Sequence, residues 1–433
     1  MSKPSKITQL LNGTYEDPDG LGRQRVATRA LVIAPKLDGM ERDLVRDLDF
    51  GPHIAIVSDK TTHAILGSRV ERALFGAYHI QSIVLADAPH PDDETVSKIR
   101  KATQKAGALI AIGSGTINDL CKFASAQDKK PYAVFATAPS MNGYTSVNAA
   151  ITEHGHKKSL PAQAPRGAFF DLSIMAAAPA RLIRSGLGDS LCRTTSQADW
   201  LLAHLLHDQP YRQLPYALLE DDEKQLFDQS AALMAGDIAV MERLVRTLVL
   251  SGFGTAIYGT SEPASQGEHL VSHYIDMLGD PERPLVYHGE QIGVTTLSLA
   301  RLQRLMLKQR PVLTADTETR ASFVERYGDA LGQSCWEDFA HKRLDDAAVE
   351  RLNDRLADSW PDMVQRIEAI SLRSDYLERV LKAAGAPVTP EEIYLPRPFY
   401  EQALLRSREI RKRYSFLDLA ANSGRLQPAL NIL

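Results

Sequence analysis

Four residues in the middle and second half of the chain have side chains that bind divalent metals. Asp189 lies in "GLGDSLC", His269 and His273 lie in "EHLVSH", and His288 lies in "VYHGEQIG". One carboxylate with two or three imidazoles suits a catalytic divalent metal that keeps an open position. Histidines are also commonly core or capping residues, and the spacing alone does not separate these interpretations.

The spacing of two of these histidines suggests different tasks for them. His269 and His273 stand four residues apart, so they share one face of an expected helix. One imidazole could then bind a metal while the other relays a proton or contacts a substrate.

A glycine-rich stretch, "GSGTINDLCK" (113–122), follows the apolar run "ALIAI" and could hold a phosphate. Gly113 and Gly115 let the backbone turn tightly and approach a ligand, and Thr116 and Asp119 begin an expected helix. The free N–H groups of that helix would attract an anion such as a nucleotide pyrophosphate. The stretch lacks the third glycine of the usual dinucleotide fingerprint, so a strand-to-helix corner without a ligand stays open.

A carboxylate ends another strand-like run. Asp59 closes "HIAIVSD" (53–59), where it could accept both ribose hydroxyls of an adenosine and repel a 2′-phosphate. Asp59 could equally cap the helix expected to follow.

Composition excludes several classes of function. The 50 basic and 54 acidic residues give a formal charge of -4, which offers no electrostatic footprint for nucleic acid or an anionic membrane. The three cysteines form no CxxC pair, so we expect the reducing cytoplasm and neither a disulfide framework nor a thiolate zinc site. No uncharged stretch reaches the roughly 20 residues that a membrane helix needs.

The pattern of apolar residues changes along the chain. Continuous apolar runs predict buried strands in the first 175 residues, and helix-like stretches between the first four predict a parallel, doubly wound sheet. After about residue 178, apolar residues recur at three- and four-residue spacing, which predicts helices. We therefore expect an α/β domain over 1–178 and a helical domain over 179–433. The predicted strands are 30–35, 53–59, 82–87, 108–113, 132–138 and 167–175.

Several ordered motifs together resemble one family. They are "GSGTINDLCKFAS", "ATAPSMNGYTSVNAAIT", "KKSLPAQAPRGAFFDL", "APARLIRSGLGDSLCR", "SEPASQGEHLVSHY" and "YHGEQIGV", with the tail "RKRYSFLDLAANSGRL" (411–426). This series resembles the glycerol-1-phosphate dehydrogenases, within the superfamily of glycerol dehydrogenase, iron-containing alcohol dehydrogenase and dehydroquinate synthase. The resemblance implies a Rossmann-like N-terminal domain, an all-helical C-terminal domain, and NAD(P) and a metal held between them.

The resemblance also implies roles for individual residues. Asp189, His269 and His288 fall on the metal ligands, and His273 falls on a further active-site histidine, which we assign to substrate contact or proton relay. The remaining positions belong to the cofactor. The pyrophosphate positions are Gly113, Ser114, Gly115, Thr116 and Asp119, and the positions near the nicotinamide are Thr137 and Ser140.

Three residues bear on the substrate. Asn142 stands where these relatives commonly have an aspartate that touches the substrate hydroxyl, and asparagine cannot act as a base at neutral pH. It could also be a structural turn residue before Gly143. Lys157 and Lys158 could meet a substrate phosphate or simply lie on a solvated surface.

The expected activity is reversible hydride transfer between NAD(P) and a small polyol phosphate, with glycerol 1-phosphate and dihydroxyacetone phosphate as the default pair. We expect zinc, with nickel or iron as alternatives, and a homodimer or higher homo-oligomer. Two alternatives stay open: a sugar-phosphate cyclase like dehydroquinate synthase, and a nucleotide-binding relative without catalysis. Residues 302–400 are longer than the core fold needs, and we expect them to reshape the cleft or a dimer contact.

Overall fold

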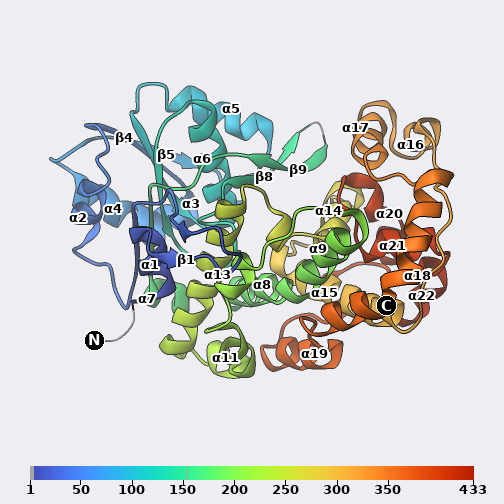
Figure 1. The fold of residues 1–433 in the computed structure, drawn as a ribbon. Helices are drawn as coiled ribbons and strands as arrows, with labels where there is room; N and C mark the ends of the chain where they lie inside the picture. Colours follow the sequence, from blue (N-terminus) through green and yellow to red (C-terminus); the bar gives the residue numbers. More distant parts are fainter. Residues whose placement is uncertain (1–3, 154) are drawn as a thin grey trace. The chain divides into compact units, whose positions relative to one another are not determined.

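The structure, a computed structural model, describes residues 4–153 and 155–433. These residues form two compact units. Of the described residues, unit 1 comprises 4–153, Lys158–Ser190 and Arg212–Ser261, and unit 2 comprises 155–157, Leu191–Tyr211 and Glu262–Leu433. Figure 1 colours the chain from its blue N-terminal strands to its red C-terminal helices.

A parallel six-stranded sheet forms the centre of unit 1, as predicted. Its spatial order is β3-β10-β7-β6-β4-β5. The central strands β6 and β7 are buried at every residue, and this burial on both faces explains their continuous apolar runs. No residue of the edge strand β5 is fully buried. The strands are β3 (Ala30–Ala34), β4 (His53–Asp59), β5 (His79–Leu85), β6 (Ala108–Gly113), β7 (Tyr132–Ala136) and β10 (Gly167–Asp171).

Helices cover both faces of this sheet. Alternate strand residues such as Ile56 and Ile110 pack in one apolar cluster with Leu66, Val70 and Leu74 of the chain between β4 and β5. The intervening strand residues point to the other face, and α6 packs against β4, β6 and β7. The helices next to the sheet are α2 (Glu41–Arg46), α3 (Lys60–Thr62), the π-helical turn η1 (His63–Gly67), α4 (Ser68–Leu74), α5 (Asp93–Ala102), α6 (Gly115–Gln127) and α7 (Leu172–Ala177).

Two short hairpin-like sheets were not predicted from the sequence. β1 (Tyr15–Glu16) pairs with β2 (Arg23–Gln24), and β8 (Asn148–Glu153) pairs with β9 (His156–Pro161). β1 and β2 have only two residues each, and β8 and β9 are only partly buried, so neither pair has the continuous apolar run that revealed the other strands.

Helices make up the rest of the chain, as predicted. β10 ends at Asp171 and α8 begins at Ala180, close to the predicted change at residue 178. The compact units are nevertheless interleaved, because α13 packs against β3 and α7 of unit 1. The division of roles, with the cofactor bound by 1–178 and the metal by 179–433, stays a prediction. These unit 1 helices are α8 (Ala180–Leu191), whose last residue belongs to unit 2, α10 (Leu214–Ala217), α11 (Glu223–Asp228), α12 (Ser230–Met234) and α13 (Ile238–Tyr258).

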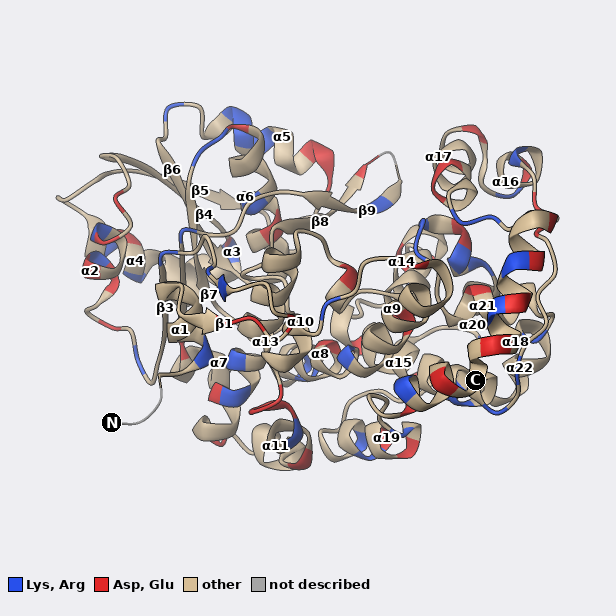
Figure 2. Cartoon of the chain, viewed as in Figure 1, with Lys and Arg blue, Asp and Glu red and all other residues tan. Residues whose placement is uncertain are grey.

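Unit 2 is helical and has its own apolar core. Its centre is formed by α9, α14 and α15, which contact one another, and by α21, which contacts α15. Figure 2 shows acidic and basic residues interspersed on single elements such as α18. On this helix, Nη1 of Arg366 lies 3.7 Å from Oδ2 of Asp362. No described helix of the protein is long and apolar enough to span a bilayer. The helices are α9 (Arg193–His207), α14 (Gly267–Leu278), α15 (His288–Leu307), α16 (Arg320–Tyr327), α17 (Asp329–Ala340), α18 (Asp346–Glu368), α19 (Ser374–Ala383), α20 (Arg397–Arg406), α21 (Phe416–Asn422) and α22 (Leu426–Ala429).

The loop between β7 and β8 is held by helices of unit 1 that approach it closely. A Cβ atom on Gly186 of α8 would lie 1.7 Å from the Pro139 carbonyl oxygen, and one on Gly252 of α13 would lie 2.2 Å from Thr145 Oγ1. On α6, the buried ammonium of Lys122 donates to the Gly143 carbonyl and, at 3.0 Å, to the Asn148 carbonyl. Burial lowers the pKa of Lys122 to about 8.

Replacing the glycine that contacts this loop should destabilise unit 1. Gly186→Ala puts a methyl group on the Pro139 carbonyl, and we expect a loss of about 1–3 kcal/mol in the free energy of unfolding. In an unobstructed helix the same exchange would stabilise by about 1 kcal/mol, so the sign of the effect is diagnostic. Urea unfolding measures it.

Gly51→Ala is the matched control, because a Cβ at this exposed loop position meets nothing within 4 Å. We expect it to change stability by less than about 0.5 kcal/mol. Equal stability of the two variants would contradict the close approach of α8 to the loop.

Candidate functional site

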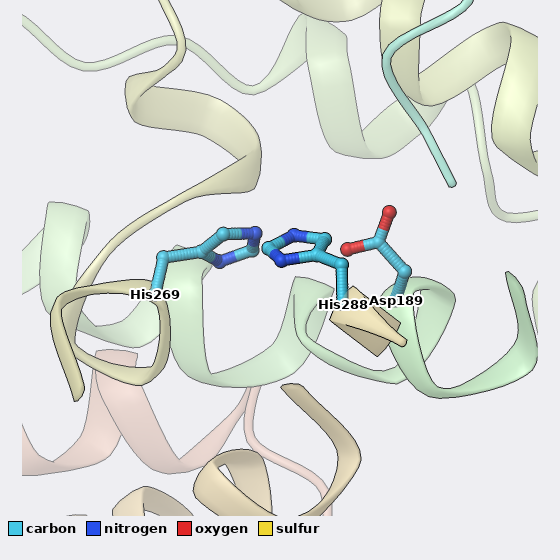
Figure 3. A group of neighbouring side chains, drawn as sticks. All are labelled: Asp189, His269 and His288. Atoms are coloured by element: carbon cyan, nitrogen blue, oxygen red, sulfur yellow. The ribbon is translucent and has the colours of Figure 1, made fainter. Parts of the chain in front are cut away.

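Three of the predicted metal ligands form one group. Asp189, His269 and His288 each offer a ligand atom, and these atoms all lie within 4.8 Å of one another. Figure 3 shows the two imidazole rings and the carboxylate together. One oxygen and two nitrogen donors match the chemistry of a three-ligand site for a borderline divalent ion, with further positions left for another ligand.

Asp189 is held from within unit 1. It lies on α8 and is only 1% exposed. Its Oδ2 accepts a hydrogen bond of 2.7 Å from the backbone N–H of Asn142. The backbone of the loop between β7 and β8 therefore orients the Asp189 carboxylate.

His269 is oriented by its neighbour on α14. Its Nδ1 lies 2.9 Å from Oε1 of Glu268, which also accepts from the Gln266 backbone N–H at 2.8 Å. Oε2 of Glu268 accepts from the hydroxyl of Thr195 on α9 at 2.9 Å. Burial works against ionisation of Glu268, but the hydrogen bond and charge of His269 hold its pKa below the usual value. Because Nδ1 carries the proton toward this carboxylate, Nε2 is the nitrogen that can bind a metal.

His288 is the first residue of α15. The residue before it, Tyr287, donates its backbone N–H to the side chain of Glu290 at 2.9 Å, which fixes the start of the helix. The His288 and His269 ring centroids are 5.1 Å apart. Two helix N-terminal turns thus bring the two imidazoles together within unit 2.

A second group of possible ligands shares His269. It consists of Cys192, Glu268 and His269, all buried in unit 2. The Cys192 thiol donates to the Ala264 carbonyl at 3.6 Å, and a metal would need the thiolate instead. Both carboxylate oxygens of Glu268 already accept hydrogen bonds. The chemistry of the donors therefore favours the set with Asp189 and His288.

His273 lies beside His269 and His288 in unit 2. Its ring centroid is 6.0 Å from that of His269 and 6.3 Å from that of His288. Its Nδ1 lies 3.2 Å from Nη2 of Arg411, and since a guanidinium only donates, Nδ1 accepts and Nε2 carries the hydrogen. Burial and the charges of Arg411, the two histidines and Lys157 hold the pKa of His273 well below its usual value.

Asp59 and Gly113, two of the predicted cofactor residues, lie at the carboxyl ends of two neighbouring strands in unit 1. β4 and β6 are parallel, with Val57 opposite Ala111, so Asp59 and Gly113 end at the same edge. β5 lies on one side of β4 and β6 on the other, so the direction of strand succession reverses here, where open α/β sheets bind ligands.

The turn into α6 is tightly packed at its first glycine. A Cβ on Gly113 would lie 2.6 Å from Ile117 Cβ, so this position favours glycine, whereas one on Gly115 would lie 3.1 Å from Met141 Sδ and needs only a small shift of that flexible side chain. Ser114 and Thr116 are half-exposed at the start of this 13-residue helix. An anion could therefore reach the first N–H groups of α6.

Four other predicted cofactor residues already have contacts within unit 1. Oδ1 of Asp59 accepts from Thr62 N–H at 2.7 Å, so the helix-capping interpretation is correct, while its ribose contact stays a prediction. Asp119 turns inward and accepts from Ala150 N–H at 3.0 Å. Thr137 and Ser140 are buried on the loop between β7 and β8.

The two lysines of the expected phosphate loop have different surroundings. The Lys157 carbonyl accepts from Arg411 within unit 2, and the Lys157 charge acts on His273. In unit 1, the Lys158 ammonium lies 4.0 Å from Glu153. Their contact with a substrate stays a prediction.

Sequence reasoning missed three residues that organise this site. Glu268 directly precedes a candidate ligand, which is the one local signal for a carboxylate that orients an imidazole. Lys122 gave no signal, because its acceptors are backbone carbonyls reached only in the fold. Arg411 lies in the quoted tail, but 138 residues separate it from His273.

Comparisons with known proteins agree on one group. A family model described as iron-containing alcohol dehydrogenase matches residues 32–179. The NAD(P)+ glycerol-1-phosphate dehydrogenase of Pyrococcus furiosus is 32% identical over 274 residues, which cover 63% of this chain and 78% of the relative. The enzyme of the same name from Halalkalibacterium halodurans is 27% identical and covers 84% of this chain and 85% of the relative.

Solved structures show the fold. A glycerol dehydrogenase from Schizosaccharomyces pombe has a TM-score of 0.64 at 15% identity, covering 93% of this chain and 88% of that chain. An NADH-dependent butanol dehydrogenase from Thermotoga maritima has a TM-score of 0.62 at 12% identity, covering 94% and 97%. The predicted fold class is confirmed.

Removing the negative charge behind His269 should weaken metal binding. Glu268→Gln keeps an oxygen for the His269 Nδ1–H but loses the charge that makes Nε2 a stronger donor. We expect the dissociation constant for Zn²⁺ to rise about 10- to 100-fold. Competition with a chromophoric zinc chelator measures it.

Glu282→Gln is the control, since Glu282 is exposed just beyond the end of α14. It should bind zinc as the unchanged protein does. Undiminished zinc affinity in the folded Glu268→Gln protein would rule out His269 as a ligand oriented by Glu268.

Proposed function

Because the chain belongs to the glycerol-1-phosphate dehydrogenase family, we propose that it is a metal-dependent, NAD(P)-linked dehydrogenase of a small polyol phosphate. The default substrates are sn-glycerol 1-phosphate and dihydroxyacetone phosphate. The observation that carries this proposal is the grouping of Asp189, His269 and His288, with donor atoms within 4.8 Å of one another.

The proposed ligands suit one divalent ion, with zinc preferred and nickel or iron as alternatives. When bound, such an ion supplies Lewis-acid polarisation of a substrate oxygen. The chain supplies the alignment: Glu268 sets the tautomer of His269, and the Asn142 N–H orients Asp189.

The cofactor residues we propose are those at the carboxyl edge of β4 and β6 and at the start of α6. When bound, the nicotinamide accepts or supplies the hydride. The turn from Gly113 to Thr116 would hold the pyrophosphate on the N–H groups of α6, and Asp59 would meet a ribose.

His273 is the proposed polar contact for the substrate. Its Nε2–H can donate to a substrate oxygen, because Arg411 occupies Nδ1. Asn142 is a second proposed contact for the substrate hydroxyl. Its amide is uncharged, so it can orient the hydroxyl but cannot take its proton. A cytoplasmic location and a homodimer or higher homo-oligomer stay predictions.

The direct test is NAD(P)H-coupled reduction of dihydroxyacetone phosphate by protein purified without chelator. We expect steady oxidation of added NADH or NADPH, loss of activity after EDTA dialysis, and recovery on adding a divalent metal. Product formation without net change in the cofactor would instead indicate a cyclase. NAD binding with no oxidation of any polyol phosphate would indicate a non-catalytic relative.

Asp59 should influence the choice between NAD and NADP. Asp59→Asn retains a good helix cap while removing the charge that would repel a 2′-phosphate. We expect kcat/KM with NADPH to rise roughly tenfold relative to NADH. Steady-state kinetics with both cofactors measures the ratio.

Asp92→Asn is the matched control, because Asp92 caps α5 in the same manner through Thr95 N–H. It should leave the cofactor ratio unchanged. An unchanged ratio in Asp59→Asn as well would remove Asp59 from the cofactor site.

A further inference from the structure

The segment after α20 (Arg397–Arg406) brings three arginines into unit 2, and they differ in their partners. After the 3-10 turn η4 (Ser407–Ile410), which packs against α14 and α17, the chain continues as "RKRY" (411–414). The buried Arg408 forms ion pairs of 2.9 Å with Asp316 and 3.0 Å with Asp418.

Arg411 forms no ion pair with a carboxylate within the part of the chain that the structure describes. Its Nη2 donates to the Lys157 carbonyl and to Nδ1 of His273, both uncharged acceptors. Asp338 acts on it only from beyond the 4.0 Å of an ion pair. Burial and the neighbouring Arg413 lower the pKa of Arg411 to about 10, so it is still charged at neutral pH.

A largely buried guanidinium without a carboxylate is costly unless an anion compensates it. The surroundings add positive charge, since Arg413 lies two residues away and the charge of Lys157 reaches His273. These cations and the His269–His273–His288 group all belong to unit 2.

The guanidinium has hydrogens left for a ligand. Nη2 uses both of its hydrogens on Lys157 and His273, whereas Nε and Nη1 make no hydrogen bond to any described residue. The three remaining N–H groups, on Nε and Nη1, point to different sides of the guanidinium, because each of its two parallel N–H pairs includes Nη2. Each can still donate a charge-assisted hydrogen bond to a phosphate oxygen.

We propose that Arg411 binds the phosphate of the substrate and makes the site specific for a phosphorylated polyol or ketone. This inference rests on the proposed function. Arg411 Nη2 lies 3.2 Å from His273 Nδ1, so the guanidinium and the His273 imidazole are adjacent, beside His269 and His288. A short molecule with a phosphate at one end and an oxygen near the other could meet both.

The first test compares phosphorylated and unphosphorylated substrates. Arg411→Gln should lower the ratio of kcat/KM for dihydroxyacetone phosphate to kcat/KM for dihydroxyacetone about 10- to 100-fold, whereas the lost hydrogen bond to His273 affects both substrates alike and leaves the ratio unchanged. Arg411→Lys keeps the charge but not the fixed donor directions, and its ratio should lie in between. Equal losses on both substrates in folded protein would overturn the assignment.

Lys412→Gln is the matched control, because Lys412 is the adjacent, exposed residue and its exchange makes the same change in net charge. It should retain the preference for the phosphorylated substrate. A loss of preference equal to that of Arg411→Gln would also overturn the assignment, since general charge would then suffice.

A binding measurement separates this inference from the proposed function. Inorganic phosphate and glycerol 1-phosphate, each added without cofactor, should raise the thermal midpoint of the unchanged protein and of Lys412→Gln, but not of Arg411→Gln. That pattern would support Arg411 even if no dehydrogenase activity were found. Dehydrogenase activity with full phosphate protection of Arg411→Gln would uphold the function and overturn the role of Arg411.

Discussion

Two buried carboxylates at the start of α14 organise unit 2. Asp199 accepts from the backbone N–H of Gly267 at 2.9 Å and of Phe416 at 3.0 Å, and from Gln303 at 3.1 Å. Glu268 accepts from α9 and from the chain entering α14. Burial and the charge of Glu268 raise the pKa of Asp199 to about 7. Such groups persist in an interior only when donors surround them, so α9, α14, α15 and α21 must converge here.

The hydrogen bond from Phe416 to Asp199 also fixes the position of the C-terminal segment 411–416. Phe416 begins α21, and its N–H is held by Asp199, so the preceding residues must pass beside α14. Arg413 donates to the carbonyl and hydroxyl of Ser265 at the approach to α14. Arg411 then reaches His273 from a position far along the chain. The segment 411–416 is therefore anchored beside α14 and next to the histidine group.

The sequence predicted the elements better than the contacts. Strands β4, β6, β7 and β10 were predictable because they are buried on both faces and read as apolar runs, whereas β8 and β9 are only partly buried. The family resemblance singled out Asp189, His269 and His288, whose donor atoms do group together, while their role as metal ligands stays a prediction. Glu268 and Arg411 were not predictable, because their importance comes from a hydrogen bond and a missing counter-charge, which only the folded chain reveals. Asp59 lay between these cases, since one position suited both a cap and a ribose contact.

The histidine group of unit 2 has neighbours of opposite charge: Arg411 and Lys157 are positive, and Glu268 is negative. Arg411 and Lys157 disfavour protonation of His273, and a metal ligand must likewise be unprotonated. The positive charges of Arg411 and Lys157 would also repel a metal ion. The negative charge of Glu268, which accepts a hydrogen bond from His269 Nδ1, reduces that repulsion. An anionic substrate held by Arg411 would act in the same direction as Glu268. The cations that disfavour protonation of His273 and the carboxylate that accepts from His269 Nδ1 therefore oppose each other, and a phosphate bound at Arg411 would offset the cations.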